Sequence, residues 1–152
     1  MRHWVFFAAL TLLTVAGVPA CASGLDDKTP DQQSIDALVA KIQQAQPREQ
    51  CFLYAELVHQ MTEFSARQYA AGDVDKASDL LRHIQQIAHN IHLSVADDNK
   101  RLKNAEILLR HTAFRLTEML HSSSLEDQPL VAETLAQVNQ AQTDAMLQVF
   151  RK

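Results

Sequence analysis

The arrangement of the chain follows from residues 73–123, which read DVDKASDLLRHIQQIAHNIHLSVADDNKRLKNAEILLRHTAFRLTEMLHSS. This stretch contains no glycine and no proline, and apolar residues recur every three or four positions. The series consists of Ala77, Leu81, Ile84, Ala88, Ile91, Val95, Leu102, Ala105, Leu109, Thr112, Leu116 and Met119. Such spacing keeps one side of a helix apolar for about seven heptads, so the stretch predicts helix with a continuous side facing the core.

The one candidate break in this stretch is residues 94–99, which read SVADDN. Asp98 takes a position of the apolar series, and aspartate and asparagine are poor residues inside a helix. A break here gives two helices of similar length to those predicted before and after them, which suits a four-helix bundle. The apolar spacing nevertheless continues across the break without a shift, so one unbroken helix of roughly 70 Å is the alternative.

Two helices are expected before this stretch. Thr29 followed by Pro30 predicts the start of a short first helix, with Thr29 as N-cap and proline in the first turn. Pro47 ends that helix and opens the second, which covers about 48–71. Gly72 then stops the second helix with almost no connecting chain, which predicts an antiparallel hairpin with the segment that follows.

A last helix is expected after the polar residues 122–127, with Ser124 or Asp127 as its cap. The chain has only 3 glycines and 4 prolines in 152 residues, and no segment alternates between apolar and polar residues. This composition favours an all-α fold. We therefore predict an antiparallel helical bundle over residues 29–152, with four main helices and a short N-terminal helix. In the alternative, the third and fourth helices are continuous as one long helix.

The first 22 residues have the order of a secretory signal peptide, with an apolar run at 4–15 followed by small residues. That run is too short to predict a membrane span. Cleavage after Ala22 would leave a polar lead at 23–28 and an exported protein, periplasmic or extracellular. The alternative is cleavage before Cys21, whose surroundings loosely resemble a lipobox and would place a lipid anchor on that cysteine.

Several functional classes find no support in the sequence. Cys51 is the only cysteine after residue 22, lies among large apolar residues, and is expected to be a buried thiol. The formal net charge is −4 and no basic stripe is present, which argues against a nucleic-acid partner. No nucleophile or phosphate-loop motif is found, so we expect no enzymatic activity and no cofactor.

A second stripe lies on the side opposite the apolar series and mixes aromatic residues with histidine and glutamate. On the second helix it contains Phe52, Glu56, His59, Glu63, Ala66 and Ala70, and on the fourth Ile107, His111, Phe114, Glu118 and His121. Large apolar residues on a solvated face favour association, worth about 1.5–3 kcal/mol each when fully covered. We therefore expect binding to a protein partner or a second copy through a surface of Phe52, Ile107, His111 and Phe114.

A metal-binding bundle is the alternative function. Glu56 with His59, and Glu118 with His121, form two Glu-x-x-His pairs, the spacing that carboxylate-bridged metal bundles use. These pairs point away from the predicted core, however, and the additional bridging glutamates are missing. They are also expected to lie roughly 22 Å apart along parallel helices, so a site would have to form between two copies.

Two segments, CFLYAEL at 51–57 and RLKNAEILLRH at 101–111, resemble those of an uncharacterised family of secreted all-helical bacterial proteins. The resemblance implies an exported helical fold. The family has no assigned activity, so the resemblance implies none for this chain.

Overall fold

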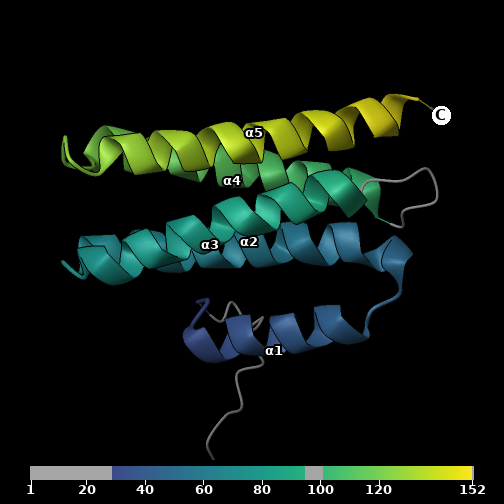
Figure 1. Ribbon diagram of the computed structural model, residues 1–152, viewed down its shortest axis with the longest axis horizontal. Coiled ribbons are helices and arrows are strands. Elements are labelled where there is room, and N and C mark those ends of the chain that lie inside the picture. Colours follow the sequence, from purple (N-terminus) through teal and green to yellow (C-terminus); the bar gives the residue numbers. More distant parts are fainter. Residues whose placement is uncertain (1–28, 95–100, 152) are drawn as a thin grey trace, which may run out of the picture.

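The computed structural model describes residues 29–94 and 101–151, which form five helices and no strand (Figure 1). The helices are α1 (Gln32–Gln44), α2 (Pro47–Ala70), α3 (Val74–Ser94), α4 (Leu102–Ser122) and α5 (Gln128–Phe150). The prediction of an all-α fold is confirmed. The predicted signal peptide, the polar lead, Cys21 and positions 95–99 of the candidate break lie outside the described residues.

Four of the helices pack around a shared core, and the packing is compatible with a bundle. α2 and α5 each contact both α3 and α4, while α1 packs on α2 (Figure 1). The described parts of residues 73–123 form two helices, α3 and α4, and Arg101, just before α4, has a left-handed backbone with φ of 59°. No helix in the described ranges is both long and apolar enough to cross a bilayer.

The directions of the packed helices follow from hydrogen bonds between them. The bonds join His59 to Thr112, Tyr69 to Ser124, Gln85 to Thr134, and His92 to Asp144. Residue numbers rise together across both interfaces, so α2 is parallel to α4 and α3 is parallel to α5. Antiparallel packing occurs between consecutive helices, in the α1–α2, α2–α3 and α4–α5 pairs (Figure 1), whereas the described parts of α3 and α4 do not contact each other. The parallel direction of α2 and α4 is the one expected for two successive hairpins.

The core contains every described member of the apolar series that runs from Ala77 to Met119. Ile84 and Ile91 on α3, and Leu109 and Leu116 on α4, have no exposed surface. The series keeps one side of each helix against its neighbours, as its spacing predicts.

The helix ends show one correction and one confirmation. α1 begins after Asp31, not after Thr29: the Ser34 amide donates to Oδ1 of Asp31 (2.8 Å), and the Asp31 amide donates to Oγ of Ser34 (2.9 Å). This reciprocal capping box satisfies two backbone amides at the start of α1. Gly72 has a φ of +84° and ends α2 as predicted, in a conformation that glycine adopts without steric cost.

Tyr69 ties the two hairpins together at their turns. Its hydroxyl donates to Oδ2 of Asp127 and accepts from the Ser124 amide, both at 2.8 Å. Ser124 Oγ donates to the same carboxylate at 2.6 Å. The bond from Ser124, followed by that from Tyr69, lowers the pKa of Asp127. Asp127 is the N-cap residue of α5, but its carboxylate binds these two hydroxyls rather than the helix amides.

Candidate functional site

The outer sides of α2 and α4 border a shallow groove of about 510 Å³. Its lining consists of His59, Glu63, His111, Phe114, Arg115 and Glu118. The groove exists because Thr112 and Leu116 of α4 are fully buried, which turns the residues between them outward along a helix of 3.6 residues per turn. The parallel packing of α2 and α4 brings the two outer stripes side by side.

His59 is held at the inner edge of this groove. Its Nδ1 lies 3.2 Å from Oγ1 of Thr112, whose own proton is donated to the Leu108 carbonyl at 2.8 Å. A hydroxyl has one proton, so Thr112 accepts, His59 Nδ1 donates, and Nε2 of the neutral ring carries no proton. Burial lowers the pKa of His59 from its ordinary value of 6.5, against the opposing effect of Glu63. The imidazole is therefore neutral at physiological pH.

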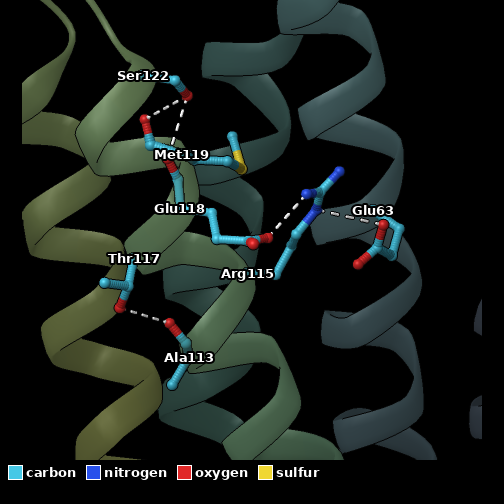
Figure 2. Close-up of polar contacts among 7 residues, drawn as sticks. All are labelled: Glu63, Ala113, Arg115, Thr117, Glu118, Met119 and Ser122. Carbon is cyan, nitrogen blue, oxygen red and sulfur yellow. Dashed lines mark hydrogen bonds and ion pairs between the residues drawn. The ribbon is translucent and has the colours of Figure 1, made fainter.

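Arg115 bridges the two helices beside His59. Figure 2 shows its guanidinium reaching from α4 toward Glu63 of α2 while it also contacts Glu118 of its own helix. The Nη1–Oε2 distance to Glu118 is 2.9 Å, and the Nε–Oε2 distance to Glu63 is 3.4 Å, an ion pair rather than an aligned hydrogen bond. Two carboxylates share one cation, so Glu63, Glu118 and Arg115 together carry a net negative charge.

Phe114 is the prominent apolar residue of this face. It is 67% exposed although it lies in the middle of α4. Of the other predicted surface residues, His111 is exposed and Ile107 is partly buried, both on the same outer side of α4. Three of the four predicted residues thus share one face.

Phe52 is placed differently from the prediction, because it is only 7% exposed. The Arg101 guanidinium carbon lies 3.5 Å from the centre of its ring, and Lys41 borders the same small cavity. The expectation that Phe52 lies on a solvated face is wrong. The end of α1 and the start of α4 cover this part of α2 within the chain.

The residues of the metal hypothesis are not brought together in one chain. The pairing of His59 with Thr112 and of Glu63 with Arg115 places Glu118 and His121 roughly nine to ten residues, or about 14 Å, beyond Glu56 and His59 along the helices. Among residues 29–94 and 101–151, no three histidine, cysteine or acidic side chains are grouped so that they could hold a metal ion. A site between two copies stays a prediction.

Sequence reasoning missed the role of Arg115. Helical spacing alone would pair Glu63 with Arg67, four residues further along α2. Glu63 instead faces Arg115, and the Arg67 guanidinium lies 5.5 Å from the ring centre of Phe64. Spacing of three residues indicates the contact of Arg115 with Glu118. The contact with Glu63 depends on how α2 and α4 are aligned, for which the sequence carries no signal.

Cys51 is not part of this face. It is fully buried and forms no disulfide, as predicted. Burial raises the pKa of its thiol to about 11, so the reactive thiolate is scarce at neutral pH.

Comparison with protein-family models, with curated proteins and with solved structures gives no match. Functional inference therefore depends on the residues of the groove and on the pattern of the sequence.

Proposed function

We propose that this chain is an exported helical-bundle protein that acts by protein–protein association through the outer face of α2 and α4. The observation that carries the proposal is Phe114, a phenylalanine 67% exposed in the middle of a helix and beside a groove. Covering such a side chain stabilises a complex by about 1.5–3 kcal/mol. Aromatic anchors surrounded by polar groups are typical of association surfaces.

The position of Phe114 distinguishes it from the other apolar residues that are more than half exposed. Leu125 lies in the turn between α4 and α5, Phe150 is the last residue of α5, and Leu93 and Leu147 lie in the last turns of α3 and α5. Exposed apolar side chains at turns and chain ends are common and need no partner. Phe114 instead lies in the middle of α4 and lines the groove, where Arg115, Glu63 and Glu118 provide a polar border.

The scaffold supports this role. We propose that α2 to α5 close into a four-helix bundle with α1 as a strap on α2, which would hold the outer face as a rigid platform. Export is supported by the signal-like order of residues 1–22. The exported protein would then act in the cell envelope, by binding and without catalysis.

The test compares Phe114→Ser with Phe150→Ser, since both remove an exposed phenylalanine. We expect the wild type to form a complex detectable by light scattering or by recovery from the native envelope. Phe114→Ser should lose that complex while Phe150→Ser keeps it, with the helical circular dichroism signal unchanged in both. A wild type that is monomeric at high micromolar concentration and recovers no partner would overturn the proposal, as would equal behaviour of the two variants.

A further inference from the structure

We infer that the partner on this face is a second copy of the chain, docked with its α4 antiparallel to the first and with a two-fold axis beside Phe114. This inference rests on the proposed association through α2 and α4, and it names the partner. The evidence is the distribution of charged and apolar residues on either side of Phe114 along the outer face of α4.

The charges are arranged symmetrically in position and oppositely in sign. Arg110 lies four residues before Phe114 and Glu118 lies four residues after it. In an α-helix, those positions are displaced equally along the axis and to opposite sides of the central residue. A two-fold axis that crosses the interface perpendicular to α4 reverses the displacement along the helix and keeps the sideways one. Arg110 of each copy would therefore lie level with Glu118 of the other, on the opposite side of the contact, where the two long side chains can reach each other. Two ion pairs, each between Arg110 of one copy and Glu118 of the other, then flank the two contacting Phe114 rings.

The side chains needed for these pairs are accessible. The Arg110 side chain is 60% exposed, and its nearest described ion-pair partner is Glu106 at the long distance of 3.9 Å. The Glu118 side chain is 48% exposed, with Arg115 on its Oε2 atom. α1 packs on α2 and makes no contact with α4, so it does not cover this face.

The remaining positions of α4 add no repulsion. Ile107 lies seven residues before Phe114 and His121 lies seven residues after it, so the dimer would bring an apolar side chain against an imidazole. Eleven residues from Phe114 in either direction, Lys103 of one copy would face Leu125 of the other. No two like charges become opposed between residues 103 and 125. Because complementary charges fix alignment more than they add affinity, Phe114 would supply most of the binding and Arg110 with Glu118 the antiparallel alignment.

The decisive experiment exchanges the charges in separate proteins, Arg110→Glu and Glu118→Arg. Each variant alone would place like charges opposite one another at both positions, and we expect its self-association to weaken at least about tenfold. A one-to-one mixture would restore both ion pairs, so a heterodimer of near wild-type affinity should form. Native mass spectrometry with one variant isotopically labelled measures this directly. Arg115 retains Glu63 when Glu118 is replaced, so folding should persist, as circular dichroism will check.

A second measurement does not depend on charge. A cysteine introduced by Phe114→Cys would lie beside its counterpart across the two-fold axis and should form a disulfide-linked dimer under mild oxidation. The native Cys51 is fully buried and does not compete. Phe150→Cys is the matched control, exposed but away from the axis, and should remain unlinked.

The outcomes separate this inference from the proposed function. Recovery of the mixed charge variants together with cross-linking at position 114 supports the two-fold dimer. Loss of a complex on Phe114→Ser, without recovery in the mixture and without cross-linking, would overturn the two-fold dimer but keep association with a different protein. No effect of Phe114→Ser on any complex would overturn both.

Discussion

The inner and outer sides of α4 differ in what holds their residues in place. On the inner side, Leu109, Thr112 and Leu116 have no exposed surface, and α4 packs here against α2 and α5. On the outer side, Phe114 and Glu118 are exposed and the described contacts are ion pairs open to water. The difference indicates that the inner side determines stability, while the outer side contributes little to folding and is available for association.

The largest expected effect comes from breaking the inner side. Leu116→Ala would remove buried methyl groups and leave a cavity, which should lower the free energy of unfolding by about 2–5 kcal/mol. Phe114→Ala, two residues along the same helix, should change it by no more than about 0.5 kcal/mol. Urea unfolding followed by circular dichroism measures both. Similar losses in the two variants would show that the two sides do not differ in this way.

The inner side could be predicted from sequence because burial repeats with the helical period. From Ala77 to Met119, every described member of the apolar series is buried. The same helical period would turn Val39 of α1 inward, four residues after Ile35, but Val39 is 38% exposed. α1 packs on α2 alone among the described helices, so the buried stripe of α1 is narrower than that of a helix with two neighbours.

The candidate site was less predictable because it depends on alignment between helices. Sequence spacing relates a residue to neighbours three or four positions away, which accounts for Arg115 with Glu118 but not for Arg115 with Glu63. The parallel direction of α2 and α4 follows from two successive hairpins, but which residues of the two helices lie side by side is not encoded in either helix. Phe52 shows the same limit, since its cover comes from Arg101 at the start of another helix.

A smaller effect is expected from the hydrogen bonds that link the inner side to the groove. Thr112→Val keeps the shape but removes the acceptor of His59 and the bond to the Leu108 carbonyl. The free energy of unfolding should fall by about 1–2 kcal/mol, because a partly buried imidazole N–H loses its partner. Thr117 is the matched control: it makes the same bond within the helix, to the Ala113 carbonyl, as Figure 2 shows.

Thr117→Val should therefore cost less than Thr112→Val in the same urea titration. The difference between the two variants isolates the contact between α2 and α4. Equal costs would mean that the His59 bond contributes nothing to stability, and that the position of His59 is fixed by packing alone.

The smallest expected effect is the pH dependence contributed by His59, whose Nδ1 binds the inner side while its ring borders the groove. Burial lowers the pKa of His59 below 6.5 in the folded chain, whereas the unfolded chain keeps the ordinary value. Between these two values the unfolded state binds more protons, so the free energy of unfolding falls as the pH is lowered through 6.5 toward the folded pKa, and is fully retained above 6.5. His59→Gln would remove this contribution while an amide N–H can still donate to Thr112. We expect the stability difference between wild type and His59→Gln to shift against the wild type from pH 7.5 to pH 5.5. Parallel pH profiles of the two proteins would show that His59 titrates alike in the folded and unfolded chains.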